Sequence, residues 1–179
     1  MNYPSLLIPN DIEKIHLNDR TLSIPKKTAT FKKWHGSKLK NTFGNKPLID
    51  FNGTPMFVEI AILKLGIISS WNGRWVETYA MKKNSPYYFM DWIDDDLVNQ
   101  KSIEVQETRI REIIESIKTE HKGFSCFWDI MLWDKDNIVF YECKRKNKDK
   151  ISPTQINWIE SALKTGLKET NFVIFEWSL

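Results

Sequence analysis

The sequence predicts an α/β protein with one mixed β-sheet covered by helices. Three observations lead to this fold class. From about residue 55 onward, apolar stretches with helical periodicity alternate with strand-like stretches. Residues 124–144 have the pattern of a β-hairpin. The chain has 179 residues, of which 41% are hydrophobic, and this fits one domain of ordinary size with a substantial core.

Residues 1–52 are polar, rich in lysine and only weakly periodic. Short strands are expected at residues 5–8 and 21–24. Residues 1–46 contain nine Lys or Arg and three Asp or Glu, a difference of +6 in a chain whose formal net charge is only +3. We therefore expect a basic N-terminal extension packed on a folded domain that comprises residues 53–179.

The first helix is expected directly after Thr54, which would cap it, with Pro55 at the first helical position. The run of residues 56–65 is apolar nearly all round, so this helix should be buried, and Gly66 should end it. Glu59 is a polar residue in the first turns of this buried helix. It cannot easily reach water from there.

A strand is expected at residues 74–81, which alternate and are rich in strand-forming residues. Residues 86–121 are expected to form a helical insert. The insert is best defined between about residues 105 and 118, where isoleucines recur at helical spacing. These are Ile110, Ile113, Ile114 and Ile117.

The hairpin has expected strands at residues 124–133 and 138–144, joined by the turn sequence Asp-Lys-Asp-Asn at residues 134–137. A tight two-residue loop in this turn fixes the register of the two strands. In that register Asp129 lies directly opposite Glu142, with Cβ atoms about 5 Å apart. Lys144 follows two residues later, and it therefore lies on the same face.

Ser152 is expected to cap the next helix, with Pro153 at the first position and Gln155 completing a capping box. This helix should end at Gly166. Residues 172–177 then form a last buried strand.

The hairpin is apolar on both faces around its charged residues, so its strands are expected in the interior of the sheet. Two neighbouring carboxylates in such a place repel each other and are poorly solvated, so a cation, a shared proton or a basic partner must compensate. Mg²⁺ suits the first option, because it takes oxygen ligands and keeps waters for substrate phosphates. A metal at Asp129 and Glu142 could activate a water, and Lys144 could orient that water or stabilise charge on the phosphate.

Simpler roles remain open for each of these residues. Asp129, Glu142 and Lys144 can form a buried ion network without catalysis. Gln155 can be only a helix cap. Glu59 can pair with a neighbouring Lys or Arg instead of a metal.

The other reactive residues give weaker signals. Glu77 is more typical of a paired or exposed strand residue than of a catalytic one. The two cysteines form no CxxC pair, so neither a structural zinc site nor a disulfide framework is expected. No catalytic role is expected for the scattered histidines His16, His35 and His121. The chain shows no signal peptide and no membrane-spanning run, which predicts a soluble cytoplasmic protein.

A family resemblance rests on the hairpin residues. Asp129, followed by twelve residues and then Glu142-Cys143-Lys144, resembles the PD-(D/E)XK nuclease motif. The Pro that precedes the Asp in this family is Trp128 here. By this resemblance Asp129 and Glu142 bind Mg²⁺, for which Mn²⁺ can substitute, with the carbonyl of Cys143 as a further ligand. Lys144 would be the catalytic lysine.

The resemblance extends over residues 53–177. The expected element order is similar to the restriction-endonuclease-like αβββαβ core, with an insert after the first strand. Glu59 matches an acidic residue that many members place on the first helix, where it would help to bind one or two metal ions. The helix with Gln155 is similar to one in the VRR-NUC and Holliday-junction-resolvase-like branches, in which a Gln often supports the catalytic site.

The sequence thus predicts a Mg²⁺-dependent nuclease that hydrolyses phosphodiester bonds in DNA, and many nucleases of this fold act as homodimers. Exposed basic residues would hold the phosphate backbone. The candidates are Lys32, Lys33, Lys38, Lys40, Arg145, Lys146 and Lys148. Two other functions remain open. One is a non-catalytic module of this fold that binds nucleic acid or a protein partner. The other is an RNA-directed nuclease, in which some of the eight tryptophans stack on unpaired bases.

Overall fold

The structure, a computed structural model, describes residues 1–82 and 85–179. Within these residues a seven-stranded sheet has the order β1-β2-β10-β9-β8-β6-β7, and a three-stranded sheet has the order β3-β4-β5. The strands are β1 Asp11–His16, β2 Thr21–Thr30, β3 Lys32–Lys33, β4 Ile49–Phe51, β5 Thr54–Met56, β6 Asn72–Lys82, β7 Ser85–Phe89, β8 Ile130–Trp133, β9 Ile138–Arg145 and β10 Phe172–Ser178. β10 is parallel to both of its neighbours, whereas the other pairs in the large sheet are antiparallel. The predicted α/β class with a mixed central sheet is confirmed.

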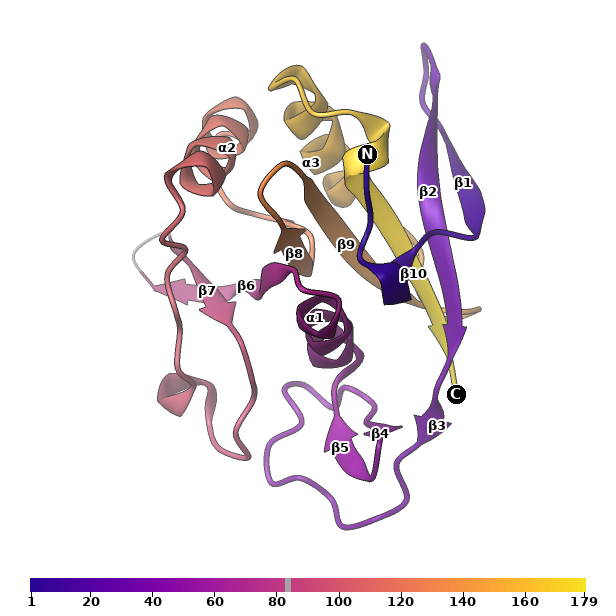
Figure 1. The fold of residues 1–179 in the computed structure, drawn as a ribbon, viewed down its shortest axis with the longest axis vertical. Coiled ribbons are helices and arrows are strands. Elements are labelled where there is room, and N and C mark those ends of the chain that lie inside the picture. The colour runs from indigo at the N-terminus through magenta and orange to yellow at the C-terminus, as the bar shows by residue number, and fades with distance from the viewer. Residues whose placement is uncertain (83–84) are drawn as a thin grey trace.

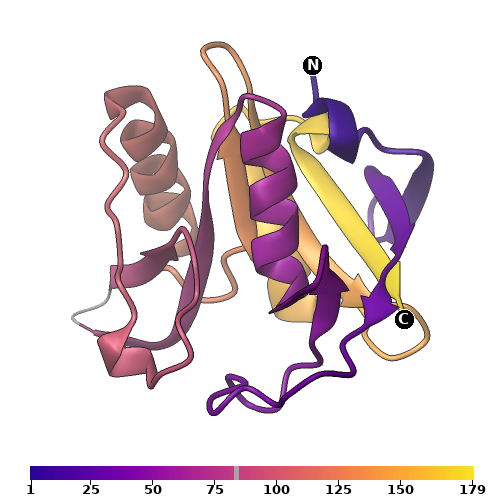
Figure 2. The ribbon, with the colours of Figure 1, turned by 60° about the horizontal axis from the view of Figure 1, so that its bottom comes forward.

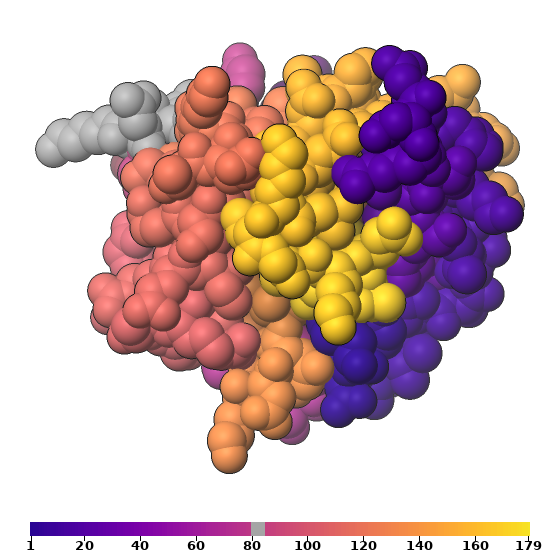
Figure 3. Space-filling model, turned by 90° about the horizontal axis from the view of Figure 1, so that it is seen from above, coloured from indigo at the N-terminus to yellow at the C-terminus, as the bar shows by residue number. Residues whose placement is uncertain are grey.

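Helices cover the two faces of the central sheet (Figures 1 and 2). The α-helices are α1 Val58–Ile68, α2 Thr108–His121 and α3 Pro153–Lys164. α1 packs on one face, against β6 and β8, while α2 and α3 pack together on the other. Figure 3 shows α2, the segment after α3 and the N-terminal segment side by side on one surface of the molecule. None of the helices in the described part of the chain is long and apolar enough to cross a membrane.

Residues 1–52, expected as an extension packed on the core, contribute directly to the central sheet. β2 pairs with β10, and Leu22 and Ile24 on β2 belong to the core. The strand expected at residues 21–24 is therefore present and continues to Thr30. The strand expected at residues 5–8 is wrong, because Ser5–Leu7 forms a 3₁₀ turn in which the N–H of Leu7 donates to the carbonyl of Pro4.

The predicted ends of the first helix are wrong. Thr54–Met56 forms β5, which pairs with β4, and Phe57 is the residue that precedes α1. Gly66 does not end the helix. It lies inside α1, where a Cβ atom would come within 2.6 Å of Leu132 Cδ1, so glycine permits close packing of α1 on β8. The helix ends at Ile68, just before Ser70 adopts a positive φ of 65°.

The expected helical insert is wrong in its first part. Ser85–Phe89 forms β7 beside β6, and residues 90–107 are mainly irregular apart from the 3₁₀ turn Leu97–Asn99. The side chain of Gln100 fixes this loop by donating to the carbonyls of Ile93 and Asp95. The amphipathic helix is confirmed as α2, with three of its isoleucines buried, namely Ile110, Ile114 and Ile117.

The hairpin has the predicted register, from Trp133 opposite Ile138 to Ile130 opposite Tyr141. Its first strand is shorter than expected, however, because β8 begins only at Ile130. Trp128, which precedes this strand, packs against Trp158 of α3. The last helix and strand are confirmed as α3 and β10.

Candidate active site

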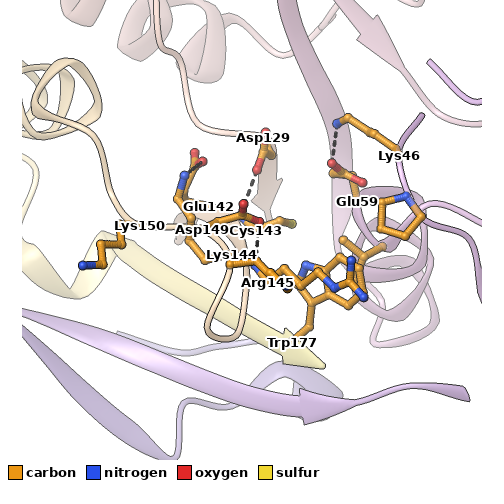
Figure 4. A pocket seen from close by; sticks show the side chains of 13 residues that line it. Lys46, Glu59, Asp129, Glu142, Cys143, Lys144, Arg145, Asp149, Lys150 and Trp177 are labelled. Atoms are coloured by element: carbon orange, nitrogen blue, oxygen red, sulfur yellow. Dashed lines mark hydrogen bonds and ion pairs between the residues drawn. The ribbon is translucent and has the colours of Figure 1, made fainter. Parts of the chain in front are cut away.

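The candidate site is a pocket at the end of the central sheet where β9 and β10 finish and α1 begins. Its volume is about 570 Å³. The lining residues are Lys46, Pro47, Val58, Glu59, Asp129, Glu142, Cys143, Lys144, Arg145, Lys148, Asp149, Lys150 and Trp177. The fold thus brings together in one pocket the two hairpin carboxylates, the lysine that follows them and the acidic residue of the first helix (Figure 4).

Asp129 stands directly before β8, one position beyond the last paired residues of the hairpin. Its Oδ2 atom accepts a hydrogen bond of 2.8 Å from the backbone N–H of Cys143. Its own carbonyl accepts one of 2.7 Å from the N–H of Val76 on β6. Contacts with the strands on both sides therefore fix the position of this carboxylate.

Glu142 is the most buried acidic residue of the pocket, with 3% of its surface exposed. Its Oε1 atom is 3.0 Å from Nζ of Lys144 and accepts a hydrogen bond of 2.5 Å from Nε2 of Gln155. Its Oε2 atom is buried and has no hydrogen-bond partner within the part of the chain that the structure describes. A buried carboxylate oxygen without a partner is costly, so this atom is suited to a ligand that supplies positive charge or a proton.

Gln155 contacts both the cap of α3 and two charged residues of the pocket. Its Oε1 atom accepts hydrogen bonds from the N–H of Ser152, at 3.0 Å, and from Nζ of Lys144, at 2.9 Å. The N–H of Gln155 donates to Oγ of Ser152, which completes the capping box of α3. Gln155 therefore joins the start of α3 to the lysine and to Glu142.

Glu59 lies in the first turn of α1 and makes an ion pair with Lys46. The simpler role for Glu59, pairing with a lysine, is thus present in the structure. Figure 4 shows this pair apart from the group formed by Asp129, Glu142 and Lys144.

The electrostatics of the pocket are dominated by carboxylates in a poorly solvated place. Burial, followed by the charge of Glu59, raises the pKa of Asp129. Burial, followed by the charge of Asp129, raises the pKa of Glu142 well above its ordinary value, against the opposing effect of Lys144. Burial also raises the pKa of the Cys143 thiol, so this side chain remains neutral. Without a bound cation the charged forms of the two hairpin carboxylates are therefore disfavoured.

The predicted nucleic-acid-binding residues divide into two groups. Arg145 and Lys148 line the pocket. Their turn is fixed by Asp149, whose carboxylate accepts a hydrogen bond from the N–H of Arg145 at 3.0 Å, and the Arg145 guanidinium lies 5.6 Å from the ring of Trp177. The other predicted residues are exposed but do not line it, and these are Lys32, Lys33, Lys38, Lys40 and Lys146.

Lys46 is the residue near the carboxylates that the sequence did not indicate. It lies in the segment between β3 and β4, a part of the chain with no recognisable pattern, and its position depends on contacts with distant segments. Glu77, expected as a paired or exposed strand residue, lies on β6, where burial raises its pKa while the charge of Lys46 lowers it. None of the histidines lines the pocket.

Within residues 1–82 and 85–179, no group of three or more His, Cys, Asp or Glu side chains is arranged to hold a metal ion. Two of the predicted ligands are paired with lysines, Glu59 with Lys46 and one oxygen of Glu142 with Lys144. The unpartnered Oε2 of Glu142, close to a second carboxylate, still fits a cation with oxygen ligands.

Comparison of this chain with protein-family models, with curated proteins and with solved structures finds no match. The resemblance to the PD-(D/E)XK motif therefore remains a prediction from the residues, and the arguments for function come from the pocket itself.

Proposed function

We propose that this protein is a Mg²⁺-dependent nuclease of the PD-(D/E)XK kind that hydrolyses phosphodiester bonds in DNA. The observation that supports this most strongly is the state of Glu142. Its Oε2 atom is buried without a partner among the described residues, while its Oε1 atom is held by Lys144 and Gln155. A purely structural ion network would be expected to satisfy both oxygens.

Asp129 and Glu142 would hold the cation, with the carbonyl of Cys143 as a further ligand. The carboxylate of Asp129 accepts a hydrogen bond from the backbone of β9, the strand that carries Glu142. The two carboxylates therefore keep a fixed separation. When bound, the ion would supply positive charge to a phosphate oxygen and to an attacking water. Burial makes such charge more effective than it would be in bulk solvent.

The residues of the chain have distinct roles in this proposal. Lys144 is held at its Nζ by Glu142 and Gln155, so its ammonium group is fixed in the pocket. It orients the attacking water and stabilises the charge that develops on the phosphate. The water oxygen bonds to phosphorus and the ester P–O bond breaks. The water gives up one proton to solvent and the leaving alkoxide takes one up from solvent, so the protons balance. Gln155 acts by positioning Lys144 and Glu142.

The rim of the pocket is suited to a nucleic-acid backbone. Arg145, Lys148 and Lys150 contribute positive charge beside the carboxylates. Six of the eight tryptophans are buried, namely Trp71, Trp75, Trp128, Trp133, Trp158 and Trp177. Their burial leaves little tryptophan surface for stacking on unpaired bases, so the proposal favours duplex DNA over single-stranded RNA.

A cleavage assay tests the proposal. Plasmid DNA, branched DNA, single strands and RNA are incubated with the protein in Mg²⁺, in Mn²⁺ and in EDTA. The same substrates are incubated with Glu142→Ala and Lys144→Ala. Glu112→Ala and Lys101→Ala are matched controls, because both residues are exposed and lie outside the pocket. We expect metal-dependent cutting of DNA that is lost in both site variants and kept in both controls.

Cutting in EDTA, or cutting that survives both site substitutions, would contradict the proposed site. One observation favours a second function. The ion pair between Lys46 and Glu59 neutralises a predicted metal ligand, as expected for a non-catalytic module of this fold. Binding of DNA without any cleavage or bound metal would identify that function.

A further inference from the structure

Lys46 is a cation fixed by its surroundings. Its Nζ is paired with Glu59 and lies 5.6 Å from the centre of the Phe43 ring and 5.2 Å from that of the Trp75 ring. Aromatic faces attract ammonium groups, so three partners hold this charge. A surface lysine that met Glu59 by chance would not have such an environment.

The segment that carries Lys46 is anchored at several points. The N–H of Asn41 donates to the carboxylate of Asp94 at 3.0 Å, and its side chain donates to the carbonyl of Asp95 at 3.1 Å. Phe43 packs edge-on against Trp75, with ring centres 5.9 Å apart. Lys46 is thus held at the pocket by contacts that are independent of the ion pair itself.

Lys46 lines the same pocket as the hairpin carboxylates. Each of two ammonium groups there is paired with one carboxylate, Lys46 with Glu59 and Lys144 with Glu142. Glu59 is therefore occupied by a positive charge that belongs to the chain, while Asp129 and the Oε2 atom of Glu142 face the pocket without an ion-pair partner among the described residues.

We propose that Lys46 takes the place of a second metal ion, so that the site binds a single divalent cation at Asp129 and Glu142 while Glu59 remains with the lysine. This inference rests on the proposed function, because it concerns the metal of the same site. In sites with two metals both ions must be recruited from solution. Here one of the two positive charges would be part of the chain.

Metal stoichiometry tests the inference without any substrate. Mn²⁺ is titrated into the full chain by calorimetry, and the number of bound ions is checked by electron paramagnetic resonance. We expect one ion per chain for the natural sequence. Lys46→Met removes the charge with little change of volume and frees Glu59, so we expect two ions per chain. Adding Glu59→Gln to that variant should return the value to one.

Two control variants complete the design. Lys46→Arg keeps the charge and should bind one ion. Lys40→Met, an exposed lysine of the same segment, should also bind one. Circular dichroism shows whether each variant is folded. If Lys46→Met does not fold, Glu59→Gln tests the inference instead, because this variant should bind one ion with the same affinity as the natural protein. Two ions in the natural protein, or a loss of affinity of tenfold or more in Glu59→Gln, would overturn the inference and leave the nuclease proposal standing. Absence of any bound ion together with absence of cleavage would overturn both.

Discussion

Asp129 and Cys143 are joined at the end of the hairpin by a hydrogen bond of 2.8 Å from the N–H of Cys143 to Oδ2 of Asp129. Asp129 precedes β8, so its side chain continues the contact between the two segments after the backbone pairing has ended at Ile130 and Tyr141. The bond uses one of the two carboxylate oxygens. The Oδ2 atom of Asp129 therefore stabilises the fold, while the other carboxylate oxygen is available to the proposed metal ion.

This relationship predicts that Asp129→Asn and Asp129→Ala differ. Asparagine keeps an oxygen that can accept from Cys143 and removes a charge from a crowded group of carboxylates. We expect Asp129→Asn to be at least as stable as the natural protein and Asp129→Ala to lose about 1–2 kcal/mol. Both should lose roughly 100-fold or more in Mg²⁺-dependent cleavage. Chemical denaturation and initial rates measure the two effects, and full activity in Asp129→Asn would contradict the role of this carboxylate.

The pKa of Glu142 predicts a dependence of stability on pH in EDTA. Burial and Asp129 raise this pKa above its ordinary value of 4.5. The folded state therefore binds the proton more tightly than the unfolded state, so the stability that Glu142 contributes is present below pH 4.5 and is lost as the pH rises toward the raised pKa. Glu142→Gln should match the natural protein in acid and exceed its stability by about 1 kcal/mol or more near pH 8.

Mg²⁺ provides the control for that experiment. A cation that binds Glu142 stabilises the natural protein and not the glutamine variant. The order of the two stabilities in alkaline solution should therefore reverse when Mg²⁺ replaces EDTA. A stability difference in EDTA that does not change with pH would contradict the assigned pKa shift.

Substitutions of Ser152 and Gln155 distinguish the capping of α3 from the contacts that Gln155 makes with Lys144 and Glu142. Ser152→Ala removes the hydroxyl that accepts from the N–H of Gln155 and leaves the contacts of Gln155 with Lys144 and Glu142 in place. We expect it to lose about 1 kcal/mol of stability and to keep its cleavage rate. Gln155→Ala should lose a similar stability and also lose activity by about tenfold or more. Equal activities of the two variants would show that Gln155 is only a cap.

The basic rim predicts how DNA binding depends on salt. Arg145→Ala combined with Lys148→Ala removes two charges from the pocket wall. If both contact phosphates, the slope of log binding constant against log salt should fall by about 2. Titration of labelled duplex in EDTA at several salt concentrations measures this slope. Lys101→Ala, an exposed lysine away from the pocket, should leave the slope unchanged.

Gly66 predicts a specific packing defect. A Cβ atom at this position would lie 2.6 Å from Cδ1 and 2.8 Å from Cδ2 of Leu132, so the leucine must move or the helix must shift. We expect Gly66→Ala to destabilise the protein by about 1–3 kcal/mol despite the higher helix propensity of alanine. Leu132→Val relieves the clash, so in the double variant the two effects should be less than additive. A more stable Gly66→Ala would contradict the close packing of α1 on β8.

The features that could be predicted from the sequence are those specified by neighbouring residues. The hairpin register follows from the turn at residues 134–137, and the capping box of α3 follows from Ser152 and Gln155. These local signals predict that Asp129, Glu142 and Lys144 lie on one face of the hairpin, and all three line the pocket.

The features that could not be predicted depend on contacts across the fold. Gly66 was interpreted as a helix stop, whereas it continues the helix because Leu132 packs against it. The strand β2 was only partly recognised, because its pairing with β10 joins residues about 150 positions apart. Lys46 had no local signal at all, since its partners come from α1 and β6.

The position of β10 determines the order in which the fold can be completed. β2 and β9 each pair with β10 and not with each other, so the N-terminal hairpin of β1 and β2 can form early but has no partner strand until residues 172–178 are present. Contacts between such distant segments require closure of long loops, and they slow folding. Trp177, which lines the pocket, belongs to this same strand. Formation of the pocket and closure of the sheet are therefore expected to occur together, as a late step in folding.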